Sequence, residues 1–370
     1  KLDQIGDIEK KYYIKWIYSI GKNQIYRKMN KLINFNLFLF GDLASMRNEI
    51  YQTYNGLCNI IFLKEIKKKY KPSSIKLLNL PQEYEELINK NLLKDENLLN
   101  NIYLIFKSTS KKIFLISKLF INIFLFIIKN IIFSLILIFI PNKNFKSNNK
   151  NLNLFLTRFP LHFKNSFTEE KYNFMFNEDS NKDVYLMDVI SDGIHQNLSY
   201  SEYFKSILKL LKFKSKFILL DKYINIFDYF STLVKIPLIF ITYIFLISKN
   251  YKYGEIDLSY SIHIEQIYSM SKNIRLLFLS PKIKRISKSK FSKSIIYTIF
   301  EYPYGRVVSY FFNNSEATKT IGMQHGPSST RKLFHYSVIN RENNIYFPKK
   351  IICEDNHYLN IYKESNYKNI

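Results

Sequence analysis

Short apolar runs separated by polar breaks dominate the second half of the chain. They are rich in β-branched, aromatic and leucine side chains, which is typical of buried strands. The runs lie at residues 152–157, 183–189, 217–220 and 295–300. Arg158 and His162 follow the first run, and we expect His162 to be an ordinary surface residue. The pattern predicts a buried β-sheet.

The most informative segment combines two predicted strands with a short predicted helix within about thirty residues. Residues 295–300 predict a strand, residues 304–313 a short helix, and residues 319–323 a second strand. A strand–helix–strand unit gives parallel neighbouring strands. Glu301 and His325, which follow the two strands, therefore belong at one carboxyl edge, where open α/β sheets bind ligands.

This edge carries residue types suited to group transfer. Glu301 is a candidate base, and His325 is a candidate hydrogen-bond donor to a leaving group. A Pro-Ser-Ser-Thr segment suits a helix start, whose free N–H groups bind anions. The candidate substrate- or phosphate-binding residues are Arg306, Gln324, Gly326, Ser328, Ser329 and Thr330. The alternatives are that Glu301 caps a turn, that Arg306 is a solvated helix residue and that the Ser-rich segment is a plain turn.

Residues 113–140 form the longest apolar stretch and predict a helix. At 100° per residue, Lys118, Asn122 and Lys129 fall within about 40° of one another, which makes one narrow polar stripe. Such a helix fits the membrane interface better than a span across the bilayer, although a buried core helix stays open as an alternative. A second run at 236–247 could pair with it as a docking surface.

Composition narrows the function classes. The formal net charge is +25, but only eight of the 55 basic residues are arginine, which disfavours a nucleic-acid reader and still suits an anionic membrane surface. Cys58 and Cys353 are too few for a disulfide scaffold or a metal knuckle. No Asp-x-Asp sequence occurs near Glu301 or His325, so we expect neither a metal nor a bound cofactor.

The segment Thr-Ile-Gly-Met-Gln-His-Gly at residues 320–326, preceded by Glu-Tyr-Pro at 301–303, resembles bacterial surface-carbohydrate glycosyltransferases of the GT-B type. These include relatives of Kdo transferases and CDP-glycerol glycerophosphotransferases. The resemblance implies an α/β fold, namely a Rossmann-like N-terminal domain with additional membrane-associating helices. It also implies a nucleotide-sugar donor, a cell-surface polysaccharide or glycolipid acceptor, and work at the cytoplasmic face of the bacterial inner membrane.

The resemblance and the composition together give the expected organisation. Residues 1–70 form a helical region, residues 71–340 a Rossmann-like acceptor-side domain with the apolar insertion at 113–140, and residues 341–370 an interdomain crossing into a truncated donor domain. The expected function is glycosyl transfer, with the chain as a fragment of the enzyme. The alternative is a non-catalytic envelope assembly protein, bound to the membrane, that holds a phosphorylated glycolipid.

Overall fold

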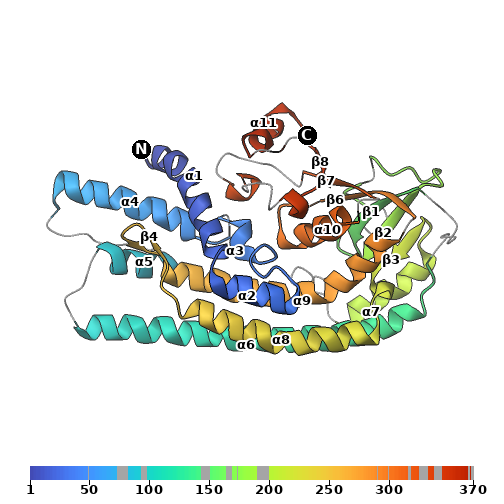
Figure 1. Ribbon diagram of the computed structural model, residues 1–370, viewed down its shortest axis with the longest axis horizontal. Helices are drawn as coiled ribbons and strands as arrows, with labels where there is room; N and C mark the ends of the chain where they lie inside the picture. The colour runs from blue at the N-terminus through green and yellow to red at the C-terminus, as the bar shows by residue number, and fades with distance from the viewer. Residues whose placement is uncertain are drawn as a thin grey trace. The chain divides into compact units, whose positions relative to one another are not determined.

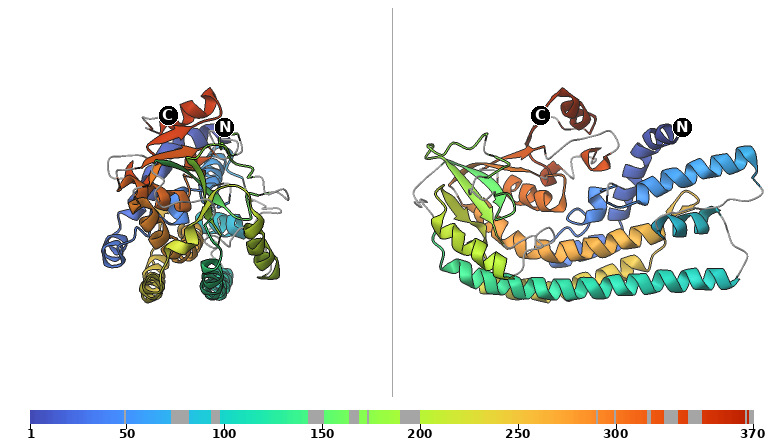
Figure 2. Two further views of the ribbon diagram at one scale, coloured as in Figure 1. Left: turned by 90° about the vertical axis from the view of Figure 1, so that its right-hand side faces the viewer. Right: turned by 180° about the vertical axis from the view of Figure 1, so that it is seen from behind.

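A computed structural model describes most of the chain, and its parts are shown in Figures 1 and 2. The described residues are 1–48, 50–72, 82–92, 98–142, 151–163, 169–172, 174–189, 200–289, 291–298, 300–315, 318–324, 332–336, 344–365 and 367. The chain forms two compact units, each built from several segments. Unit 1 comprises residues 1–121, 237–273 and 328–338, and unit 2 comprises residues 122–236, 274–327 and 339–370.

Unit 1 is mostly helical, as expected for residues 1–70. Its helices are α1 (Leu2–Gly21), α2 (Gln24–Ile33), α3 (Asp42–Ser45), α4 (Thr53–Tyr70), α5 (Gln82–Leu92) and the 3-10 turn η3 (Leu333–Tyr336), with the short hairpin β4 (Lys252–Tyr253) and β5 (Ile256–Asp257). The side chain of Asn23 caps α2 by accepting from the Ile25 N–H. In α1, Ile14, Ile17 and Ile20 are buried at helical spacing, so one stripe packs inward.

Three long helices contribute residues to both units. They are α6 (Leu98–Ile138), α8 (Ile226–Ile247) and α9 (Ser259–Lys288). The predicted helix at 113–140 is therefore part of a longer one. The division also differs from the expected boundaries at residues 70 and 340, because the chain passes between the units along these helices.

Unit 2 contains a six-stranded parallel sheet, which makes the protein α/β with a Rossmann-like sheet. The strands are β1 (Leu152–Arg158), β2 (Asp183–Asp188), β3 (Phe217–Leu219), β6 (Ser292–Thr298), β7 (Lys319–Met323) and β8 (Lys350–Ile352). Their order is β3-β2-β1-β6-β7-β8. Numbered within the sheet this is 3-2-1-4-5-6, the order of doubly wound dinucleotide-binding folds.

Helices cover both faces of this sheet. On one face, Phe155, Tyr185 and Phe217 pack in a core with Leu210 and with Phe133 of α6. Leu210 belongs to the 3-10 turn η1 (Leu210–Lys212), which continues α7 (Tyr200–Lys209). The other face carries α10 (Pro303–Asn313), where Ser309 Oγ lies 2.5 Å from the hydroxyl of Tyr297 in β6. Burial on both sides explains why the strands read as continuous apolar runs.

The predicted strand–helix–strand unit is confirmed, since β6 and β7 are parallel neighbours joined by α10. Residues 341–370 differ from the expected crossing. β8 pairs in parallel with β7 as the sixth strand, and α11 (Asn356–Glu364) packs in the same unit through Tyr362 against Phe300. The described part of this segment thus continues the Rossmann-like sheet, because Ile351 is buried in it.

Candidate functional site

The strand order reverses its direction between β1 and β6, which gives the sheet a topological switch point there. The chain builds outward from β1 to β3 on one side and from β6 to β8 on the other. Connections that leave β1 and β6 therefore diverge at the carboxyl edge. Ligands of open α/β sheets bind at such a switch point.

An arginine, an aspartate and a tyrosine meet at this switch point. Arg158 ends β1 and Asp188 ends β2, and the two residues are partners in the strand register. Tyr304, in the first turn of α10, donates a hydrogen bond of 2.8 Å to Asp188 Oδ2. The guanidinium of Arg158 lies 4.5 Å from the centre of the Tyr304 ring. Cation–π contact and burial hold the arginine at the carboxyl edge.

A buried ion pair lies behind Asp188. Lys282 of α9 places its Nζ 2.5 Å from Asp221 Oδ1, and both side chains are fully buried. Asp221 belongs to η2 (Leu220–Tyr223), directly after β3, and its Oδ2 accepts from the Val189 N–H at 2.8 Å. The network therefore joins α9 to the ends of β2 and β3.

The electrostatics leave Asp188 able to exchange a proton near neutral pH. Burial, followed by the negative charge of Asp221, raises the pKa of Asp188 to about 7, although Lys282 and Arg158 act in the opposite direction. Burial alone would lower the pKa of Lys282, but Asp221 and Asp188 raise it overall, so the lysine stays charged. The edge thus combines fixed cations with a protonatable carboxyl group.

A second polar cluster follows β1. Glu169 accepts hydrogen bonds from Thr157 Oγ1 at 3.0 Å and from the Tyr172 N–H at 2.5 Å. Burial raises the pKa of Glu169 to about 7 against the lowering effect of these bonds. His162 Nδ1 lies 3.7 Å from Glu169 Oε1, and the His162 side chain is 13% exposed. His162 is therefore largely enclosed, unlike the ordinary surface residue that the sequence predicts.

Glu301, the predicted base, is buried in the described structure. Only 2% of Glu301 is exposed, and its Oε1 accepts a hydrogen bond from the hydroxyl of Tyr362 in α11. Phe300 packs beside it on the same tyrosine, with ring centres 5.6 Å apart. In this arrangement Glu301 secures α11 against the end of β6.

Two predicted phosphate-binding residues also make structural contacts. Arg306 is fully buried in α10, with its guanidinium 5.3 Å from the Phe347 ring centre, so it differs from the expected solvated or substrate-facing arginine. The backbone N–H of Gln324 donates to the Ile352 carbonyl at 3.0 Å, and its side-chain Oε1 accepts from the Glu354 N–H at 3.2 Å. Gln324 therefore ties the end of β7 to the end of β8.

The other predicted site residues lie outside the described residues. They are His325, Gly326, Ser328, Ser329 and Thr330. The proposed pairing of Glu301 with His325 thus stays a prediction. Among the described residues, no group of three His, Cys, Asp or Glu side chains is placed to hold a metal ion.

The residues that sequence reasoning missed are Arg158, Asp188 and Tyr304. Arg158 and Asp188 carried a weak signal, because both sit where predicted strands end and arginine is scarce in this chain. Their meeting depends on strand order, which the sequence did not reveal. Comparison of the chain with known proteins finds no matching family, no matching curated protein and no matching solved structure.

Proposed function

We propose that the chain belongs to a membrane-bound glycosyltransferase that transfers a sugar or related group from a nucleotide-activated donor to a cell-surface polysaccharide or glycolipid. The observation that carries the proposal is the cluster of Arg158, Asp188 and Tyr304 at the switch point of a Rossmann-like sheet. A guanidinium suits a phosphate of an activated or lipid-linked substrate. A carboxyl group that titrates near pH 7 suits proton transfer with an acceptor hydroxyl.

The resemblance implies work at the cytoplasmic face of a bacterial inner membrane, and two apolar helices support the membrane association within this proposal. Residues Thr109–Ile138 of α6 and Ile226–Ile247 of α8 are long and apolar enough to cross a membrane, and only 33% and 28%, respectively, of their most apolar stretches is buried. Phe114, Phe124, Phe227 and Phe230 are among the large apolar side chains that face outward. Exposed apolar surface of this extent marks an interaction site.

Contacts between the two helices favour a shared surface. In unit 1 the rings of Phe120 and Phe240 lie 5.6 Å apart. In unit 2 the hydroxyl of Tyr229 lies 2.5 Å from Ser134 Oγ. The lower-numbered residue of α6, Phe120, contacts the higher-numbered residue of α8, Phe240, and Ser134 contacts Tyr229, so the contacts have an antiparallel order. Lys118 is exposed on α6, and a cation on an apolar helix fits an anionic lipid interface.

A second function is a non-catalytic envelope assembly protein that binds a phosphorylated glycolipid. The burial of Glu301 under Tyr362 favours it, and so does the burial of Asp188, which is 3% exposed and accepts from Tyr304, because a base must reach its substrate. Both proposals place a phosphate-bearing ligand at Arg158. The two proposals differ in whether the protein catalyses a transfer or only binds the ligand.

The test is a transfer assay on membranes that contain the protein. Labelled UDP-, CDP- and CMP-linked sugars are supplied, and label in lipid and polysaccharide fractions is counted. The glycosyltransferase proposal predicts that label from one donor is incorporated at a higher level than in control membranes that lack the protein. Saturable glycolipid binding with no incorporation from any donor would favour the assembly protein, and the absence of both would refute the two proposals.

A further inference from the structure

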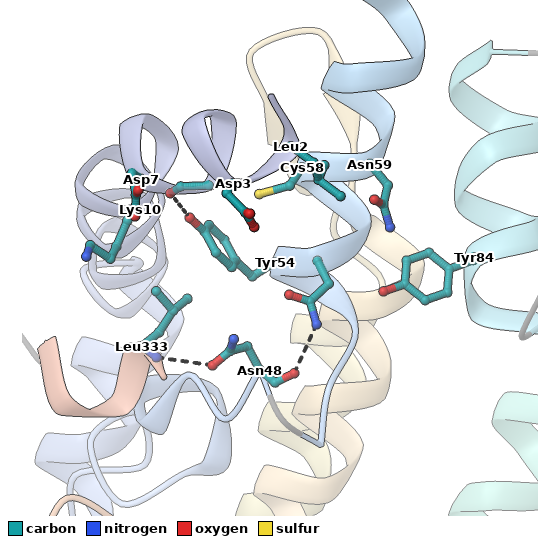
Figure 3. A pocket seen from close by; sticks show the side chains of 12 residues that line it. Leu2, Asp3, Asp7, Lys10, Asn48, Tyr54, Cys58, Asn59, Tyr84 and Leu333 are labelled. Carbon is teal, nitrogen blue, oxygen red and sulfur yellow. Dashed lines mark hydrogen bonds between the residues drawn. The ribbon is translucent and has the colours of Figure 1, made fainter. Parts of the chain in front are cut away.

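Unit 1 contains a polar pocket of about 410 Å³, which is within the size range of small-molecule sites. It is bordered by α1, α4, α5 and Leu333 of η3. Figure 3 shows Asp7 and Lys10 on one side and Asn59 and Tyr84 on the other, with Tyr54 between them. None of the candidate residues at the sheet edge lines this pocket.

Close contacts hold the pocket walls in place. The Tyr54 hydroxyl donates to the Gly6 carbonyl, which joins α4 to α1. A Cβ on Gly56 would lie 2.7 Å from a Leu87 methyl group, so α4 and α5 approach closely only because residue 56 is glycine. The Leu333 N–H donates to Asn48 Oδ1 at 3.1 Å. Braced walls of this kind preorganise a binding site.

Two polar groups remain available to a ligand. Within the described part of the chain, the carboxylate of Asp7 and the amide of Asn59 make no hydrogen bond or ion pair, although both residues line the pocket. An amide offers both donors and an acceptor, whereas a carboxylate offers acceptors only. Cys58 also lines the pocket, but burial raises the pKa of its thiol to about 11, so it is a neutral wall residue.

The charge of the pocket disfavours phosphates and other anions, which the strongly basic chain as a whole would attract. Its charged lining consists of Asp3, Asp7 and Lys10, a formal −1 in a chain of +25. A phosphate or nucleotide would meet two carboxylates here. A hydrocarbon ligand would leave the Asn59 amide and the Asp7 carboxylate without a replacement for water.

We propose that this pocket binds a neutral, hydroxyl-rich ligand, namely one or two rings of a saccharide. Sugar hydroxyls both donate and accept, so they match a lining of amides and carboxylates, and the Tyr84 ring offers an apolar wall for C–H groups. The pocket goes beyond the proposed transfer reaction, since it recognises uncharged sugar and takes no part in activating a donor. Saccharide binding here can be present or absent whether or not the chain transfers sugars.

The test is a binding titration of the 370-residue chain with glucose, galactose, N-acetylglucosamine and lactose. Saturation-transfer NMR and calorimetry should detect saturable binding of at least one of them. Asn59→Ala should weaken that binding about tenfold, equivalent to about 1.4 kcal/mol. Lys68→Ala on the exposed face of the same helix is the matched control and should leave it unchanged.

Three outcomes would overturn the proposal. The first is that folded protein, with the circular dichroism of a helical chain, binds none of these sugars at 50 mM. This concentration is on the order of ten times a weak millimolar Kd. The second is sugar binding that Asn59→Ala leaves unchanged. The third is saturable binding of spermine, with no sugar able to displace it, which would make the acidic lining a polycation site.

Discussion

Replacing Lys282 by methionine should be among the most damaging single changes in unit 2. Methionine keeps the length and apolar stem of lysine but removes its charge. Asp221 then keeps a fully buried carboxylate without the cation that now lies 2.5 Å away. Breaking a buried ion pair by removing one partner costs about 3–5 kcal/mol in unfolding free energy. We expect a loss of this size at neutral pH.

The loss should also depend on pH. The folded-state pKa of Asp188 is about 7, above its ordinary value of 3.8, so the folded protein keeps a proton that the unfolded chain releases in this window. Stability from this group is present below pH 4 and is lost as the pH rises through the folded-state pKa. Lys282 lowers this pKa, so removing it extends the loss to higher pH. Lys282→Met should therefore be more destabilising at pH 8 than at pH 5.

Urea unfolding followed by far-UV circular dichroism measures both effects. Lys284→Met on the exposed side of α9 is the matched control and should change the unfolding free energy by less than about 0.5 kcal/mol. Adding Asp221→Asn to Lys282→Met removes the orphaned charge and should restore part of the stability. If Lys282→Met unfolds like Lys284→Met at both pH values, the buried network does not stabilise the fold and the reasoning fails.

Three further changes test other parts of the account. Gly322→Ala should cost about 1–3 kcal/mol, because the new Cβ would lie 2.6 Å from Phe300 and 2.7 Å from Pro348, whereas Gly6→Ala meets only Tyr54 at 3.8 Å; equal unfolding midpoints would contradict the close packing. Tyr362→Phe removes a donor to the buried Glu301 and should cost about 1–3 kcal/mol in urea unfolding, and an unchanged midpoint would show that the contact contributes nothing. Flotation with anionic vesicles should fall with rising salt and should fall at least tenfold in Phe227→Ser/Phe230→Ser, since about 1.4 kcal/mol is tenfold; salt-insensitive binding with both helix ends protected from protease would instead indicate spanning helices.

The strands were predictable where local pattern decides. The runs at β1, β2, β3 and β6 are largely buried on both faces and thus read as nearly continuous apolar segments. α9 was harder to predict from the sequence. Its buried Glu265, Lys272 and Lys282 interrupt the apolar pattern because distant partners satisfy buried polar groups, as Thr53 does for Glu265.

The candidate site depended more on distant contacts than the fold did. The sequence correctly placed Glu301 just beyond a strand end, but its burial follows from Tyr362, which is 61 residues further along the chain. Arg158, Asp188 and Tyr304 come together only through the order of the sheet. Spacing along a sequence carries no information on such pairings, so the predicted and observed edge residues differ.

The central claim is that Arg158 at the switch point serves a transfer reaction. The most direct measurement compares label incorporation by membranes carrying the wild-type protein, Arg158→Ala and the exposed control Lys212→Ala, each at equal protein level and with unchanged circular dichroism. The account predicts that Arg158→Ala lowers the rate on the order of 10²-fold, as for loss of a positioned charge, while Lys212→Ala retains it. Equal rates in all three proteins, or no incorporation by the wild type from any donor, would contradict the claim.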